Sequence, residues 1–266
     1  MYKNIGFIGT GNMGGTIAKV VYSNISDSSL YLSDHSAEKL ADFAKLLPGS
    51  IQSSNIEIAE KCSLIFLAVK PQVLPAVLKE IAPVLMARKD RFVIASMAAG
   101  TTIDKIVSMI GIKCPVIRMM PNTPVSVAAG VIQYCYQDTS EEDVNDYIAL
   151  LENAGTVDYL PENLIDAACA LSGSGPAYAY TFIDALADGA VACGLPRENA
   201  IKYAAQMVEG AAKMVRCSGQ HPDVLKDAVC SPGGTTIEGV RALEEAGFRG
   251  AVIDAILAGY MKAKNM

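Results

Sequence analysis

The stretch from Asn4 to Gly14, NIGFIGTGNMG, decides the fold. It begins as a short apolar run of β-prone residues and ends in a turn that contains Gly9, Gly11 and Gly14. Apolar residues with helical spacing follow, at Ile17, Ala18, Val20 and Val21. The first glycine would tighten the turn, and the second would let a pyrophosphate approach the N–H groups at the helix start. Such turns also occur without a ligand, but the position between a strand and a helix favours a dinucleotide site.

The rest of the first half repeats this alternation. Further strands are expected at residues 30–33, 64–69, 91–96, 116–119 and 131–134. Helices are expected at residues 37–46, 73–85, 103–109 and 141–153. The alternation predicts an α/β fold, with a Rossmann-type, doubly wound and mostly parallel sheet over residues 1–160.

The second half, residues 161–266, has a different pattern and predicts an all-helical domain for substrate binding and dimerisation. Helices are expected at residues 163–170, 177–193, 197–216, 236–246 and 249–262. Between residues 177 and 191 only Asp184 and Asp188 are charged, which predicts a helix buried on most sides. The many glycines and alanines of this half would let backbones approach closely, and we expect a homodimer formed through it.

Composition narrows the classes of function. The net charge is −6, so nothing resembles the basic stripe of a nucleic-acid-binding protein, and the apolar runs are too short for a membrane span. The seven cysteines show no C-x-x-C spacing and no export signal precedes them, which favours reduced thiols and a cytoplasmic location. With two histidines, His35 and His221, there is little material for a zinc site or a Ser-His-Asp triad, and no metal is expected.

Asp34 leaves the choice of coenzyme open. It follows the second expected strand, 20 residues after Gly14, where a carboxylate could bind a ribose diol and repel a 2′-phosphate, which would favour NAD. Alternatively, Asp34 faces solvent or caps the next helix, and its neighbours Ser33, His35, Ser36 and Lys39 receive a phosphate.

Three other segments would lie near bound ligands. Lys70 follows a buried strand, and ligands of such sheets lie beyond the carboxyl ends of the strands. SGSGP at residues 172–176 and SPGGTT at residues 231–236 each precede a helical pattern, with Thr236 as the expected N-cap. A hinge or a plain cap is the alternative for each. If an apolar helix starts there, its unpaired N–H groups would favour a bound anion.

At these residues the chain closely resembles the pyrroline-5-carboxylate reductases, over nearly its whole length. The resemblance rests on FIGTGNMGG near the start, AVKPQ at residues 68–72, MAAGTT at 97–102, RMMPNTP at 118–124, LSGSGPAY at 171–178, ALADGAV at 185–191 and LKDAVCSPGGTT at 225–236. It implies a reductase that forms L-proline from 1-pyrroline-5-carboxylate by hydride transfer from NADP(H), with NAD(H) as the alternative. It also implies dimers interlocked through the helical domain, which in several members assemble into decamers.

The resemblance assigns roles to single residues. Coenzyme-binding residues would be Ile8, Gly9, Thr10, Gly11, Asn12, Met13, Ser33, Asn55, Ala68, Val69, Lys70, Pro71, Met97, Ala98 and Ala99. Substrate-binding residues would be Glu162, Ser231, Gly233, Gly234, Thr235 and Thr236, and the Thr236 hydroxyl would act near the ring nitrogen as the catalytic group. Two rival functions are a reductase of the same architecture for another imine or a 3-hydroxy acid, and a coenzyme sensor without turnover.

Overall fold

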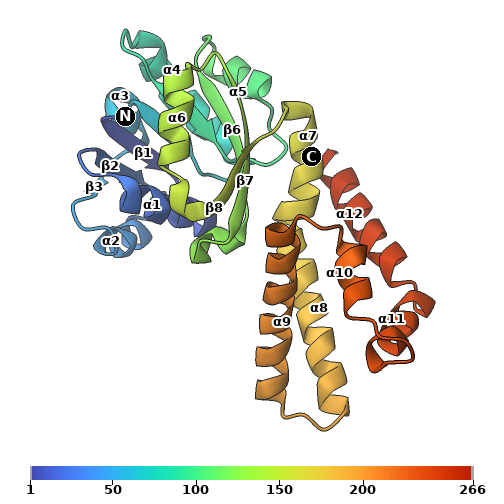
Figure 1. The fold of residues 1–266 in the computed structure, drawn as a ribbon. Coiled ribbons are helices and arrows are strands. Elements are labelled where there is room, and N and C mark those ends of the chain that lie inside the picture. Colours follow the sequence, from blue (N-terminus) through green and yellow to red (C-terminus); the bar gives the residue numbers. More distant parts are fainter. Residues whose placement is uncertain (1, 265–266) are drawn as a thin grey trace. The chain divides into compact units, whose positions relative to one another are not determined.

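An eight-stranded sheet forms the centre of the first of two compact units. The computed structural model describes residues 2–264, and its first unit includes residues 2–173 (Figure 1). The strands run in the order β3-β2-β1-β4-β5-β6-β7-β8. Every pairing is parallel except that of β6 with β7. The strands are β1 (Asn4–Ile8), β2 (Ser29–Ser33), β3 (Ile51–Gln52), β4 (Leu64–Leu67), β5 (Val93–Ser96), β6 (Val116–Pro121), β7 (Gly130–Gln137) and β8 (Gly155–Tyr159).

Helices cover both faces of this sheet because its central strands are apolar on both sides. Alternate residues point to opposite faces, so Phe7 and Phe66 belong to one core cluster while Ile8 and Ile65 belong to the other. The first cluster includes residues of α1 (Asn12–Asn24), α2 (Ala37–Lys45) and α6 (Glu141–Ala149). The second includes residues of α3 (Asn55–Lys61), α4 (Leu74–Ala87) and α5 (Ile103–Ile110). The expected doubly wound sheet is confirmed.

The second unit, residues 174–259, is helical throughout. It consists of α8 (Gly175–Ala192), α9 (Arg197–Ser218), α10 (Pro222–Ala228), α11 (Thr235–Glu245) and most of α12 (Phe248–Lys264). Gly194, with a φ of 95°, lies in the turn between α8 and α9, and Pro196 is the N-cap of α9. The expected all-helical second part is confirmed, whereas the boundary between residues 160 and 161 stays a prediction.

The SGSGP segment differs from the loop that we expected. Helix α7 (Glu162–Ala168) continues into a π-helical turn, η3 (Cys169–Gly173), and then into α8, so no open helix start exists there. Ser172 holds this turn against the sheet: its carbonyl oxygen accepts from Asn122 Nδ2 at 3.0 Å, and its hydroxyl is 2.8 Å from Gln133 Nε2. The anion site expected at this segment is therefore wrong, because the preceding turns leave no exposed helix N-terminus.

Several short elements were missed. The helix expected over residues 141–153 ends at Ala149, and a 3₁₀ turn, η2 (Glu152–Ala154), leads into β8. The sequence pattern also did not indicate β3, α3, α10 or the 3₁₀ turn η1 (Thr123–Val127). Each has eight residues or fewer, and β3 and β8 are mostly exposed, so neither repeats the alternation of a half-buried strand.

Burial of the helices and cysteines differs between the two units. In α8 only Ala187 is buried, so the expectation that this helix is buried on most sides is wrong for the single chain. All seven cysteines are unpaired, and those in the first unit are more buried than those in the second. Within residues 2–264 no helix combines the length and apolarity that crossing a membrane requires.

Candidate active site

Most of the expected coenzyme residues lie at the carboxyl ends of neighbouring parallel strands. The loops that follow β1, β4 and β5 leave neighbouring parallel strands at their carboxyl ends, and Ser33 ends the adjacent β2. The strand order reverses between β1 and β4, which is where ligands bind in open sheets of this kind. The glycine loop, residues 9–14, lies at this position.

The glycine loop is a backbone cradle that side chains would fill. Gly9 has a φ of 101°, and a Cβ on it would be 2.6 Å from the carbonyl oxygen of Ala68. A Cβ on Gly14 would be 2.3 Å from the carbonyl oxygen of Gly9. Gly11 has no neighbour within 4 Å of its Cβ direction, so the loop is open there. The loop thus packs tightly against the β4 end and leaves room at Gly11, which fits a pyrophosphate.

The start of α1 offers free donors to an anion. Its N-cap is Gly11, no side chain in the described part of the chain caps it, and its first turn has no acidic residue. The N–H groups of Gly11, Asn12 and Met13 are therefore available, and the positive end of the helix dipole lies at the same place. Gly11 and Asn12 are exposed, while Met13 is half-buried and packs on the core. This arrangement fits the phosphates of a dinucleotide.

Ser33 and Asn55 are brought together. The buried Ser33 hydroxyl donates to Asn55 Oδ1 at 2.7 Å, and Asn55 Nδ2 donates to Glu80 Oε2 at 2.8 Å. Asn55 is the first residue of α3, just after Ser54, whose hydroxyl caps that helix. The two residues expected near the coenzyme thus form one hydrogen-bonded unit beside the end of β2.

The two loops expected beside the nicotinamide consist mostly of small or apolar residues. Ala68 and Val69 are half-buried after β4, and Lys70 is exposed. In the loop after β5, Ala98 is buried, while Met97 and Ala99 are half-buried. Because β4 and β5 are adjacent, the two loops leave neighbouring strands at their carboxyl ends.

The Asp34 carboxylate neither faces solvent nor caps α2, and its expected contact with a ribose stays a prediction. Its carboxylate accepts hydrogen bonds from the Thr10 N–H at 2.8 Å, the Thr10 hydroxyl at 3.0 Å and the Ser36 N–H at 3.1 Å. Helix α2 is capped by Ser36 instead, whose hydroxyl accepts from Lys39 N. Burial acts to raise the pKa of Asp34, but these hydrogen bonds outweigh it and hold the pKa below its usual value of 3.8.

The SPGGTT segment is an exposed helix start. Gly233 has a φ of 65°, and the Gly234 N–H donates to the carbonyl oxygen of Ser231 at 3.0 Å. Gly234, not Thr236, is the N-cap of α11, so the expected N-cap is wrong: Thr235 and Thr236 are the first two helical residues. Among the described residues no side chain caps this helix, and its first N–H groups are open to an anion.

Glu162 forms part of an ion-pair network around the buried Arg118. One of its carboxylate oxygens accepts from the Ile103 N–H at 2.8 Å, at the start of α5, and is 3.3 Å from Arg118 Nη1. Arg118 is 1% exposed, and its Nη2 is 2.6 Å from Asp166 Oδ1. The network joins β6, α5 and α7, and only the arginine of the RMMPNTP motif could have indicated it from the sequence. The expected substrate contact of Glu162 stays a prediction.

Two family models match the chain. The model described as pyrroline-5-carboxylate reductase dimerisation matches residues 162–266, and the one described as NADP oxidoreductase, coenzyme F420-dependent, matches residues 4–100. The pyrroline-5-carboxylate reductase of Escherichia coli (strain K12) is 41% identical, over 100% of this chain and 99% of that protein. The chain belongs to the pyrroline-5-carboxylate reductase family. Pyrroline-5-carboxylate reductase 3 of Danio rerio is also 41% identical, over 98% of this chain and 91% of its own.

A solved member of the pyrroline-5-carboxylate reductase family has the same fold. The Plasmodium falciparum pyrroline carboxylate reductase, solved with NADP bound, superposes with a TM-score of 0.87 at 32% identity. The match covers 99% of this chain and 97% of that one. The sequence resemblance, the fold class and the assignment as an oxidoreductase of this family are confirmed.

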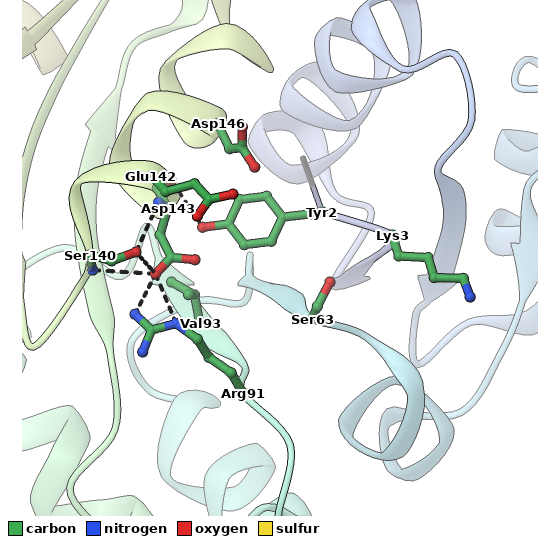
Figure 2. Close-up of a pocket in the computed structure, with 9 residues that line it drawn as sticks. All are labelled: Tyr2, Lys3, Ser63, Arg91, Val93, Ser140, Glu142, Asp143 and Asp146. Carbon is green, nitrogen blue, oxygen red and sulfur yellow. Dashed lines mark hydrogen bonds and ion pairs between the residues drawn. The ribbon is translucent and has the colours of Figure 1, made fainter.

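A separate pocket lies at the amino ends of the parallel strands, at the opposite end from the glycine loop. Figure 2 shows its lining residues: Tyr2, Lys3, Ser63, Arg91, Val93, Ser140, Glu142, Asp143 and Asp146. Lys3, Ser63 and Arg91 precede β1, β4 and β5, so the pocket, of roughly 350 Å³, is far along the strands from the glycine loop. The Asp143 carboxylate is bound by Arg91 and Ser140, so its charge is already neutralised by an ion pair. The pocket is therefore not the coenzyme site.

Proposed function

We propose that this protein reduces 1-pyrroline-5-carboxylate to L-proline, with NADPH as the reductant. The observation that carries the proposal is the pair of uncapped helix starts, at α1 and α11, in a chain of this family. One start follows the glycine loop and suits a pyrophosphate, and the other follows SPGGTT and suits a small carboxylate. A substrate with one carboxylate and no phosphate matches the second start.

The coenzyme is assigned to the first unit. The glycine loop, from Ile8 to Met13, would hold the pyrophosphate, and the Ser33–Asn55 unit would lie at the adenosine ribose. The half-buried loops after β4 and β5, residues 68–71 and 97–99, would line the nicotinamide. The cradle formed by Gly9 and Gly14 supports this assignment, since any side chain at either position would clash with backbone atoms.

The substrate is assigned to the exposed SPGGTT segment. Its carboxylate would accept from the N–H groups of Gly234, Thr235 and Thr236 and from the Ser231 hydroxyl, with Gly233 allowing the turn. In the described structure the Gly234 N–H already donates to Ser231 O, so the N–H groups of the two threonines are the freer donors. A carboxylate held in this way has a fixed orientation, which sets the position of its ring.

The proposed reaction needs few acidic or basic side chains, because a protonated imine is already electrophilic. Bound reduced nicotinamide supplies a hydride, which becomes the new C–H bond at the imine carbon as the C=N π electrons move to nitrogen. The protein holds the imine in its protonated, electrophilic form and excludes water from the ring. The hydroxyl of Thr236, the second residue of the same helix, would donate a hydrogen bond or relay a proton at the ring nitrogen.

We further propose a homodimer formed through the helical unit, which can assemble into decamers, and a cytoplasmic location. The dimer is supported by an apolar groove of roughly 500 Å³ between α8 and α12. Phe182 and Phe248 line it with ring centroids 5.7 Å apart, and Tyr180 on α8 is 61% exposed. Exposed apolar side chains gathered in one groove are typical of an interface. The cytoplasm is supported by the seven unpaired cysteines.

Steady-state kinetics with the purified full chain tests the function. We expect NADPH to be oxidised when racemic 1-pyrroline-5-carboxylate is added, with L-proline as the identified product and NADH as a poorer reductant. A panel that includes other cyclic imines and 3-hydroxy acids serves as the comparison. Turnover of a 3-hydroxy acid with no reaction of pyrroline-5-carboxylate would overturn the proposal, and coenzyme binding without any turnover would favour the sensor.

A further inference from the structure

We propose that Asp34 is a positioning residue that holds the glycine loop in its coenzyme-binding shape, and that it does not select between NADH and NADPH. The inference rests on the proposed coenzyme site. It differs from the usual role of an acidic residue at the end of the second strand, which is to bind the ribose 2′-hydroxyl and repel a 2′-phosphate. Selection between the two coenzymes then depends on His35 and Lys39 beside it.

Both carboxylate oxygens of Asp34 already accept hydrogen bonds from the protein. Oδ2 accepts from both the N–H and the hydroxyl of Thr10, at 2.8 and 3.0 Å. Oδ1 accepts from the Ser36 N–H at 3.1 Å and is 2.9 Å from His35 Nδ1. A carboxylate has about four lone-pair positions; three of them accept hydrogen bonds here, and His35 Nδ1 lies against Oδ1. The side chain is 8% exposed, so a ribose diol would have to displace donors that the protein already supplies.

The contact acts on the part of the loop that shapes the phosphate site. Thr10 lies between Gly9, which has a φ of 101°, and Gly11, the N-cap of α1. Asp34 binds both polar groups of Thr10, so it fixes the Thr10 side-chain rotamer and directs its N–H toward β2 and away from a ligand. The Gly9 N–H donates to the Ser33 carbonyl oxygen at 2.8 Å, so two consecutive loop residues are tied to the end of β2. The N–H groups of Gly11, Asn12 and Met13 then remain for the pyrophosphate.

The groups around Asp34 can accept a 2′-phosphate even though Asp34 is an anion. The His35 side chain is 89% exposed and next to the carboxylate, and Lys39 is exposed on the first turn of α2. Ser33 is engaged with Asn55, and the Ser36 hydroxyl caps α2. The Lys39 ammonium and the exposed His35 ring are therefore the groups that can approach a phosphate, while the carboxylate charge is compensated by its own donors.

Binding constants of NADPH and NADH, measured by calorimetry on the full chain without substrate, test the inference. We expect Asp34→Asn and Thr10→Val each to weaken both coenzymes by the same factor, roughly 5- to 50-fold, as for a lost hydrogen bond to a charged group. The ratio of the two constants should stay within about twofold of the original protein. The double variant should lose little more coenzyme affinity than the weaker-binding single variant, because both changes act on the same Asp34–Thr10 contact.

Two variants of the neighbouring residues test which groups select NADPH over NADH. His35→Gln and Lys39→Ala should weaken NADPH binding by roughly 2- to 5-fold each and leave NADH binding unchanged, as expected for exposed contacts to a charged group. An Asp34→Asn protein that gains affinity for NADPH while losing NADH, or that binds both as before, would overturn the inference. Thr10→Val gives the same decision if the asparagine variant does not fold. Because substrate is absent, the outcome does not depend on whether pyrroline-5-carboxylate is the substrate.

Discussion

The Thr236 hydroxyl is the one side-chain group assigned to the chemical step. We expect Thr236→Ala to lower turnover by roughly 10- to 1000-fold while NADPH affinity is kept, since a single orienting or proton-relaying contact is lost. Thr236→Ser keeps a hydroxyl at the second residue of α11 and should retain most of the activity. Stopped-flow turnover and coenzyme binding measure the two effects. Equal activity in the alanine and serine variants would remove the hydroxyl from the mechanism.

Gly234 tests the substrate carboxylate site. A Cβ there would be 2.4 Å from the Ser231 hydroxyl oxygen and 3.2 Å from the Ser231 carbonyl oxygen, so Gly234→Ala must move the segment. We expect the KM for pyrroline-5-carboxylate to rise by about tenfold or more, with NADPH affinity unchanged.

Gly239, in the same helix, has no atom within 4 Å of a new Cβ and provides the control. Gly239→Ala should leave the KM unchanged and stabilise the helix by up to about 1 kcal/mol. If both alanine variants have the KM of the original protein, the carboxylate does not bind at this helix start.

For single residues, the sequence indicated which residues belong to the site, but not which of them contact each other. The resemblance named Ser33 and Asn55 separately, and the structure joins them by one hydrogen bond. The partner of Asp34 could not be predicted, because Thr10 is 24 positions away and the contact depends on how β1 and β2 pair. Likewise, Thr236 is of a residue type that often caps helices, but the turn at Gly233, which has a positive φ, places the N-cap earlier, at Gly234.

Among the secondary structure elements, the buried network of Arg118 determines how α5 and α7 attach to β6. Asp166→Asn removes the charge paired with Arg118 Nη2 at 2.6 Å, in a place where the arginine is 1% exposed. We expect the free energy of unfolding, measured in urea, to fall by about 3 kcal/mol, because a buried charge loses part of its compensation.

The control for this network is an ion pair on the surface. Arg241 pairs with Glu238 and Glu245 on α11, and all three side chains are more than half exposed. Arg241→Met should change the urea midpoint very little. Similar losses in the Asp166 and Arg241 variants would mean that the buried network adds no stability of its own.

The long or fully buried elements were predictable, and the short exposed ones were not. Strand β4, with four consecutive buried residues, reads as an apolar run in the sequence. Strand β3 has two exposed residues and is held by its pairing with β2, so no local pattern marks it. The π-helical turn η3 was mistaken for a loop because its Ser-Gly composition resembles a hinge. The contacts that hold it, from Ser172 to Asn122 after β6 and to Gln133 of β7, are long-range.

For the whole molecule, the proposed dimer is the feature that a single chain cannot show. Val252 lines the apolar groove of the helical unit and is 45% exposed, so a charge there costs the isolated chain little. We expect Val252→Glu to shift the protein from dimers to monomers in sedimentation experiments, since a buried carboxylate would lack a partner.

Val127 provides the matched control. It is 73% exposed on η1 of the first unit, and Val127→Glu should leave the dimer intact. An original protein that sediments as a monomer, or a Val252→Glu protein that remains dimeric, would contradict the assignment of the groove as the interface.

The uneven burial of the cysteines gives the molecule a built-in set of labelling positions. Burial raises the pKa of Cys62 to about 12 and those of Cys114 and Cys135 to about 11, so these thiols hold little reactive thiolate at neutral pH. Cys193 and Cys217 are exposed, and both belong to the helical unit. A maleimide dye added to the native protein should therefore mark that unit first, and its fluorescence would follow assembly without any engineered cysteine.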